Sequence, residues 1–357
     1  MKFPLSMTRD YVRHWGVAQA TREFIQNAID SEAAFEWELE GDTFLVTSKG
    51  VELDRRTLLL GATSKADDPS SIGSFGEGYK IAMLVLCREG KEVKVYNGTR
   101  EWTPMFQWSQ DFNDDVLVVD EVEGSNDYGG LTFSVSGLTY SEIKQVQESC
   151  LFMHDPIPPD EVHDTCNGRI LLNQKYAGCL YVNGLFVSTT QMAYGYDFEP
   201  HALKLERDRK TVSGWDLAWA VKDMWAHTNC WDYIADMIQR KVPDAQHFRY
   251  GCYRELRDKC HENLIQSHGA DAVVATSQQE LETYKSKGFS NVILTNDEFA
   301  EQVRAAVSYV EVAPDPDPKP AEVLREFYDN HKTMFDPTMC ADFNKIIDIA
   351  ENNWENA

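Results

Sequence analysis

Three glycines, Gly73, Gly76 and Gly78, stand immediately before the apolar segment YKIAMLVLC, a pattern typical of a loop that leads into a buried helix. Their spacing leaves a backbone without side-chain bulk. Such a backbone can lay its amides along phosphate groups, and the start of the following helix adds partial positive charge. Lys65 and Lys80 flank this stretch with formal charge. A plain turn into a helix is the simpler interpretation, and the glycines alone fit both.

A second pattern lies upstream, in the segment TREFIQNAIDSEA. At 100° per residue from Glu23, Asn27 falls at about 40° and Asp30 at about −20°, so the three polar groups share one stripe of a helix. The apolar residues cluster on the opposite side: Phe24, Ile25, Ala28 and Ile29. The helix is therefore expected to present two carboxylates and an amide in front of a hydrophobic core. Taken alone, the segment also fits an ordinary amphipathic surface helix.

The composition limits the classes of partner. The chain has 357 residues, with 34 Lys and Arg against 58 Asp and Glu, giving a net charge of −24 at pH 7. Such an acidic surface disfavours non-specific binding to nucleic acid or anionic lipid. No apolar run approaches the roughly 20 residues that span a bilayer, and the start of the chain has no signal-peptide core. Eight cysteines without a C-x-x-C pair are expected to be reduced thiols. These features predict a cytoplasmic protein.

The order of predicted elements indicates an α+β protein rather than alternating βαβ units. A helix is expected over residues 8–33, a strand over 43–48 and a buried helix after Gly78, followed by strands in KEVKVYNG, WTPMFQW, DVLVVDEV and GLTFSVSG. We predict an α/β sandwich over 1–137, a second α/β domain over 138–228 and a helix-rich α/β region over 229–312. A proline-rich linker is expected over 313–320 and a helical tail over 321–357.

Together and in this order, the two patterns resemble the N box and the second glycine box of the GHKL superfamily, which includes gyrase B, the ninety-kilodalton heat-shock chaperones, sensor histidine kinases and MutL. Glu23, Asn27, Ala28 and Asp30 match E-x-x-x-N-A-x-D, and IGSFGEGYKIA is very similar to the chaperone and MutL glycine boxes. The likeness covers residues 8–137 well, is weaker over 138–228 and is absent beyond. It implies a Bergerat-type ATP-binding domain followed by a transducer-like domain.

The resemblance implies specific roles. Glu23 would be the general base for the water that attacks the γ-phosphate, and Asn27 would hold magnesium through its amide oxygen. Asp30 would support the base of the pocket, residues 66–78 would form a lid, and Thr132 would lie by the adenine. The nucleotide-contacting residues implied by the loop and its flanks are Lys65, Gly73, Ser74, Phe75, Gly76, Glu77, Gly78, Tyr79 and Lys80.

One motif departs from the family pattern. The first glycine box, D-x-G-x-G, supplies an aspartate that accepts the adenine amino proton, but the equivalent stretch here is LVTSKGVELD. Thr47 or Ser48 stands where that aspartate is expected, and only Gly50 remains of the glycines. A hydroxyl accepts the same hydrogen bond more weakly than a carboxylate does, so the base specificity stays open.

Two basic residues in the second block are candidates for a γ-phosphate sensor. In the family, a transducer domain sends a Lys or Arg back to the nucleotide, and LKLERDRKTVSGWDLAW places Arg209 and Lys210 just ahead of a predicted helix. A salt-bridged surface segment is the alternative, because Glu206, Asp208 and Asp216 lie close in sequence.

Other motifs carry weaker signals. Cys252, Cys260 and His261 lack the second close pair that a zinc site needs. The fragment DAVVAT–SQQELETYKSKG–NVILT is typical of a βαβ scaffold without a phosphate loop, and Ser277 and Thr295 are both candidate helix caps.

The leading hypothesis is a magnesium-dependent ATPase that converts ATP and water to ADP and phosphate. Its cycle would drive a clamp-like or chaperone-like change that acts on a protein partner, with a homodimer as the expected assembly. The alternative is a nucleotide-sensing interaction protein with little hydrolysis, of the kind that would fit a phage or bacterial defence factor.

Overall fold

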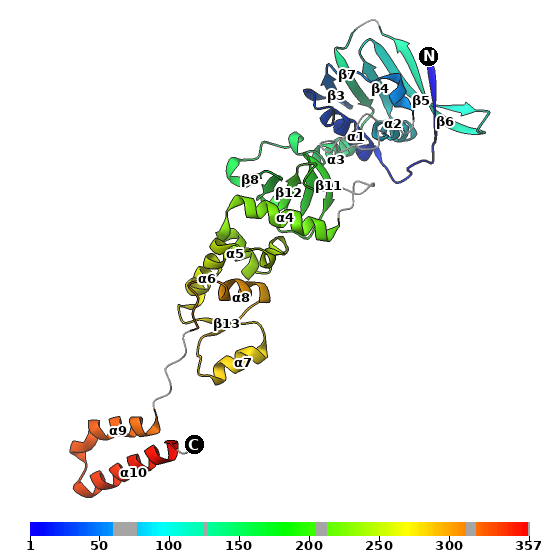
Figure 1. Ribbon diagram of the computed structural model, residues 1–357. Helices are drawn as coiled ribbons and strands as arrows, with labels where there is room; N and C mark the ends of the chain where they lie inside the picture. Colours follow the sequence, from blue (N-terminus) through cyan, green and yellow to red (C-terminus); the bar gives the residue numbers. More distant parts are fainter. Residues whose placement is uncertain (60–76, 125–126, 204–212, 312–318, 356–357) are drawn as a thin grey trace. The chain divides into compact units, whose positions relative to one another are not determined.

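The computed structural model describes residues 1–59, 77–124, 127–203, 213–311 and 319–355. The chain divides into two compact units, Met1–Gly251 and Cys252–Ala357. The predicted boundary after residue 228 therefore falls inside the first unit. The prediction of an α+β protein is confirmed at this level: the first unit is built on a large antiparallel sheet, and the second is rich in helices (Figure 1).

Within the described residues, the first sheet has seven strands in the order β1-β6-β5-β4-β7-β3-β2, and each neighbouring pair is antiparallel. The strands are β1 (Lys2–Thr8), β2 (Phe35–Glu40), β3 (Thr43–Lys49), β4 (Glu92–Asn97), β5 (Arg100–Ser109), β6 (Asp114–Glu123) and β7 (Gly130–Ser136). The helices of this part are α1 (Val17–Ile29), α2 (Gly78–Arg88) and α3 (Tyr140–Glu148), with a 3-10 turn at Arg55–Leu58.

The predicted helix over residues 8–33 is wrong in its extent. Residues 2–8 form β1, and α1 begins only at Val17, after the N-cap Gly16. β1 pairs with β6, more than a hundred residues away, so local sequence carries no sign of the pairing. Pro4 sits in this strand because β1 lies at the edge of the sheet, where a missing N–H costs little.

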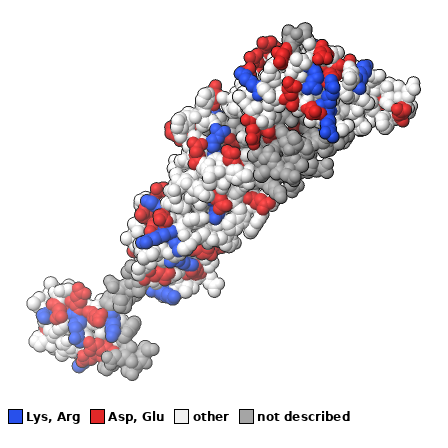
Figure 2. Space-filling model, turned by 45° about the horizontal axis from the view of Figure 1, so that its top comes forward, with Lys and Arg blue, Asp and Glu red and all other residues white. Residues whose placement is uncertain are grey.

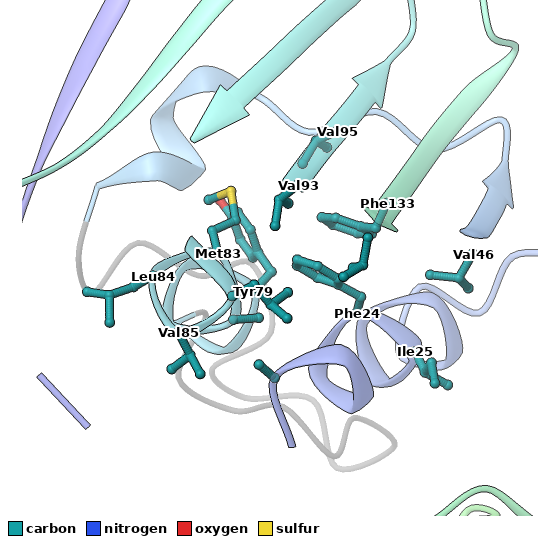
Figure 3. Packing of buried hydrophobic residues seen from close by; sticks show 14 of the residues in the cluster. Phe24, Ile25, Val46, Tyr79, Met83, Leu84, Val85, Val93, Val95 and Phe133 are labelled. Carbon is teal, nitrogen blue, oxygen red and sulfur yellow. The ribbon is translucent and has the colours of Figure 1, made fainter. Parts of the chain in front are cut away.

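The main core lies between one face of this sheet and helices α1 and α2. Phe24 of α1 stacks on Phe133 of β7, with ring centroids 4.4 Å apart and planes at 8°. Met83 and Val85 of α2 are fully buried in the same cluster (Figure 3). α1 and α2 therefore lie side by side on the sheet, and the sheet fixes how their polar sides are oriented.

A smaller sheet follows in the first unit, with strand order β11-β10-β12-β9-β8 in the described residues. Its strands are β8 (Val162–Thr165), β9 (Gly168–Leu171), β10 (Cys179–Val182), β11 (Leu185–Thr189) and β12 (Gly195–Phe198), and only β10 and β12 pair in parallel within it. α4 (Gly214–Thr228) contacts β8 and β9, and α5 (Trp231–Gln239) follows it.

The second unit contains the predicted βαβ fragment. β13 (Val273–Ala275) and β14 (Val292–Leu294) pair in parallel around α7 (Gln278–Ser286), and α6 (Arg254–His268) packs on α8 (Asp297–Arg304). Ser277 caps α7 as expected, whereas Asn296, not Thr295, caps α8. The expected helical tail is a pair of helices, α9 (Pro320–His331) and α10 (Pro337–Glu355).

Candidate functional site

Both carboxylates of the polar stripe of α1 are buried, and Asn27 between them is half-buried. Glu23 is 2% exposed, Gln26 1% and Asp30 9%, although the opposite side of the helix already packs in the core. An ordinary amphipathic helix would leave this stripe in water, because burying a carboxylate costs several kcal/mol unless other groups compensate. A guanidinium nitrogen of Arg22 lies 3.8 Å from the Glu23 carboxylate. The stripe is thus an interior polar surface.

Asn27 is held in a defined orientation on that stripe. Its amide nitrogen donates a hydrogen bond of 2.7 Å to the main-chain carbonyl of Glu23, one turn earlier. The amide oxygen is therefore turned away from the helix backbone. A neutral oxygen donor next to a buried carboxylate is a ligand type that Mg²⁺ accepts.

Gln26 is a residue that the sequence analysis missed. At 100° per residue it lies about 60° from Glu23, on the flank of the same stripe. In the part of the chain that the structure describes, its buried Oε1 atom has no hydrogen-bond partner. The sequence held a clue to this residue. Gln26 follows Phe24 and Ile25 on the helix, and an amide that is buried with such residues needs a hydrogen-bond partner.

The start of α2 brings a buried cation close to the 3-10 turn at Arg55–Leu58. The Nζ atom of Lys80 donates hydrogen bonds to the carbonyls of Thr57 at 2.8 Å and Leu59 at 2.6 Å, and its side chain is fully buried. Burial lowers the pKa of Lys80, and the nearby carboxylate of Glu77 partly opposes that shift. The ammonium group thus sits among main-chain carbonyls, in a place that favours an additional negative charge.

Tyr79 fixes the same turn from the neighbouring position. Its hydroxyl donates a hydrogen bond of 2.8 Å to the carbonyl of Thr57, and it lies 2.9 Å from the Thr57 hydroxyl. Burial raises the pKa of Tyr79 to about 12. Its ring belongs to the core beneath α2, as Figure 3 shows. Tyr79 and Lys80 therefore anchor the turn to the first residues of α2.

Strand alternation separates the candidate base-binding residues. The hydroxyls of Thr47 and Thr132 lie 2.9 Å apart on paired strands, but Val46 and Phe133, their neighbours, face α1. Because successive side chains alternate between faces, Thr132 and Thr47 project from the face opposite α1 and α2. The structure does not bring Thr132 together with Glu23. Ser48 faces the helices instead, and its cross-strand neighbour is Leu131.

Several predicted site residues lie outside the described residues. They are Lys65, Gly73, Ser74, Phe75 and Gly76 of the glycine loop, together with the sensor candidates Arg209 and Lys210. The structure does describe Glu23, Asn27 and Asp30 on α1 and Glu77, Gly78, Tyr79 and Lys80 at the start of α2, and these two helices pack against each other.

Figure 2 shows Asp and Glu side chains spread over the visible surface with Lys and Arg among them. Over the described ranges, no three His, Cys, Asp or Glu side chains gather in a way that would hold a metal ion. All eight cysteines are free thiols. No helix in the described part of the chain is both long and apolar enough to cross a membrane.

Comparison with known proteins adds one distant relative. No protein-family model matches the chain. An uncharacterized protein of Mycoplasma pneumoniae is 24% identical over 218 residues, which cover 56% of this chain and 86% of that protein.

Proposed function

We propose that the first unit is an ATP-binding domain of the GHKL type, with a Bergerat-type sandwich, and that it hydrolyses ATP in a magnesium-dependent reaction. The buried polar stripe of α1 is the observation that carries this proposal. A helix that served only to cover the sheet would not need two buried carboxylates on its polar side. A buried carboxylate beside a substrate, by contrast, can accept a proton from an attacking water.

The residues present fit a magnesium ion. The Asn27 amide is oriented by its bond to the Glu23 carbonyl, so a neutral oxygen is presented. A neutral ligand suits an ion that already binds negatively charged phosphate oxygens. When bound, the ion would neutralise charge on the triphosphate. Glu23 then serves as the base, and Asn27 positions the substrate complex relative to it.

Lys80 supports the phosphate end of the proposed site. Among the described residues, its buried ammonium donates hydrogen bonds only to main-chain carbonyls. A phosphate oxygen within reach would offset the cost of burying that charge, and it would raise the lowered pKa of Lys80. Gln26 offers a second polar atom, an acceptor for a water or a ligand hydroxyl.

The broader role follows from the same resemblance. We infer a nucleotide cycle that drives a clamp-like or chaperone-like change in the following domain, which acts on a protein partner and operates as a homodimer in the cytoplasm. Ser48 and its cross-strand neighbour Leu131 stand nearest to the position at which the family has its adenine-binding aspartate. We therefore expect weak discrimination between adenine and guanine.

Glu23→Gln tests the proposal, because it keeps the shape of the side chain and removes the base. We expect the variant to bind ATP about as well as the wild type and to hydrolyse it roughly a hundredfold or more slowly. Glu38→Gln on β2 is the matched control, since Glu38 is exposed. Binding is measured by calorimetry and turnover by phosphate release.

The outcomes separate the two functions considered. Loss of turnover with binding retained supports the ATPase. Undiminished turnover in Glu23→Gln contradicts the assignment of the base. A wild-type protein that binds ATP without measurable turnover favours the nucleotide-sensing alternative instead.

A further inference from the structure

A cleft of about 830 Å³ lies in the first unit on the open face of the smaller sheet. The other face of that sheet packs on α4. There the His163 ring lies edge to face with the ring of Trp225, and the Trp225 indole N–H donates a hydrogen bond to the Tyr196 hydroxyl. Alternation therefore turns Asp164, Arg169 and Asp197 toward the opposite face, and all three line the cleft. The volume is that of a typical small-ligand or peptide side-chain site.

The floor of the cleft is a row of charges across three strands. Asp164, Arg169 and Asp197 stand directly opposite one another on β8, β9 and β12. Asp197, which is 6% exposed, accepts from Arg169 Nε at 3.1 Å and from its Nη2 atom at 2.5 Å, and from the Gly184 N–H at 2.7 Å. Its carboxylate is thus fixed by three donors.

The Gly184 donor comes from a built turn. Asn183 and Gly184 connect β10 to β11, and both have positive φ, as the two-residue hairpin turn of type I′ requires. Gly168, at the start of β9, also has a positive φ, and a Cβ there would lie 2.1 Å from the Asp197 carbonyl. The local sequence therefore specifies the shape of this floor.

The net charge of the lining is negative. Four carboxylates, those of Asp155, Asp164, Asp197 and Glu199, face one guanidinium, that of Arg169. Arg169 is already paired with Asp197. Asp155, Asp164 and Glu199 are exposed and form no ion pair within the described residues. Among the described residues they leave the cleft with a net negative charge, which favours a cation.

The opposite wall of the cleft is apolar. Phe35 of β2 and Phe152 meet edge to face, with ring centroids 5.7 Å apart, and Ile29 and Ile157 extend this wall. An occupant must therefore combine a positive group with an apolar one at neighbouring positions.

We propose that this cleft binds an extended segment of a partner protein in which arginine or lysine alternates with large apolar residues. The basic side chain lies over Asp164 and Glu199, and the apolar one packs on Phe152. The charge complementarity and the aromatic wall carry this assignment. It does not depend on the nucleotide site, and it is tested without nucleotide.

The probe is a blocked nine-residue peptide of alternating arginine and leucine, titrated into the full-length protein by calorimetry. Two further peptides replace every arginine by glutamate or every leucine by serine. We expect the arginine–leucine peptide to bind, the glutamate peptide not to bind, and the affinity to fall as salt screens the exposed charges.

Variants locate the binding. Asp164→Asn with Glu199→Gln should weaken binding roughly tenfold, because each exposed ion pair contributes modestly. Asp42→Asn in the turn between β2 and β3, combined with Glu92→Gln on β4, makes the same change in net charge and should leave the affinity unchanged. Phe152→Ser should weaken the binding of the arginine–leucine peptide and leave the binding of the arginine–serine peptide unchanged. Melting temperatures check that each variant is folded.

Three results would overturn the proposal. They are no binding of the arginine–leucine peptide at millimolar concentration, equal losses in the two double variants, and equal binding of the glutamate peptide. None of these results bears on ATP binding, so failure here is distinguishable from failure of the proposed function.

Discussion

The side-chain nitrogen of Asn27 lies 2.7 Å from the main-chain carbonyl of Glu23 and donates a hydrogen bond to it. This bond ties the amide that we assign to magnesium to the helix turn that carries the proposed base. The orientation of one group thus depends on the backbone of the other. A change at Asn27 is therefore expected to affect the free protein as well as its ligand binding.

Asn27→Asp should destabilise the free protein by about 1–2 kcal/mol at pH 7, because it removes the N–H donor and adds a third carboxylate beside the buried ones of Glu23 and Asp30. The loss should shrink as the pH falls toward 4, where the introduced aspartate begins to take up a proton. Urea unfolding at the two pH values measures it.

Asn344→Asp is a close control for this change. The Asn344 amide makes the same type of bond, 2.9 Å to the carbonyl of Cys340, on the exposed side of α10. Its replacement should cost much less, because water solvates the new carboxylate. Equal losses at the two positions would show that the stripe of α1 does not behave as a buried surface.

Tyr79 should make the protein lose stability at alkaline pH. Its pKa is raised by burial from 10.0 to about 12. Below pH 10 both the folded and the unfolded states keep the proton. Between pH 10 and 12 the unfolded state releases it first, so this stabilisation is lost as pH rises toward the folded pKa. Two pKa units correspond to a loss of up to roughly 3 kcal/mol.

The measurement compares unfolding free energies at pH 8 and pH 11 for the wild type, Tyr79→Phe and Tyr140→Phe. Tyr79→Phe should lose less stability between the two pH values than the wild type does. Tyr140 is highly exposed, so its variant should follow the wild type. A Tyr79→Phe protein with the wild-type alkaline loss would contradict the account.

Phe24→Ala should destabilise the first unit by about 3–5 kcal/mol, because it leaves a cavity where Phe24 stacks on Phe133. The same change removes the contact that sets the rotation of α1 on the sheet. We therefore expect weaker ATP binding as well. Phe112→Ala, at an exposed position, is the control and should affect neither property.

Much of the fold was predictable where the pattern is local. The strand predicted at 43–48 is β3, the apolar run after Gly78 is α2, and the turn residues bound the later strands of the first sheet. β1 and β2 were not predicted. β1 depends on a distant partner. β2, with the sequence FEWELE, alternates apolar and acidic residues as a half-buried strand does, and the sequence analysis missed this signal.

The site was predictable only in part. The spacing of Glu23, Asn27 and Asp30 follows from helix geometry, but the burial of Glu23 and Asp30 depends on packing that no periodicity reveals. The choice between Thr47 and Ser48 needed the strand register, which decides the face on which each side chain lies. The same register moves Thr132 away from the helices. The spacing of a motif along a strand does not show on which face of the sheet each side chain lies. That assignment needs at least one residue of the strand whose packing in the core is known.

Thermal unfolding with magnesium and ATP tests the central claim most directly. At 100 times its dissociation constant, a ligand stabilises the folded state by about 2.7 kcal/mol, which should raise the midpoint by several degrees. We predict such a rise for the wild type with ATP, a smaller difference between ATP and GTP than between either and no nucleotide, and no rise for Asn27→Ala. A wild-type midpoint that does not move with millimolar ATP and magnesium would contradict the nucleotide site.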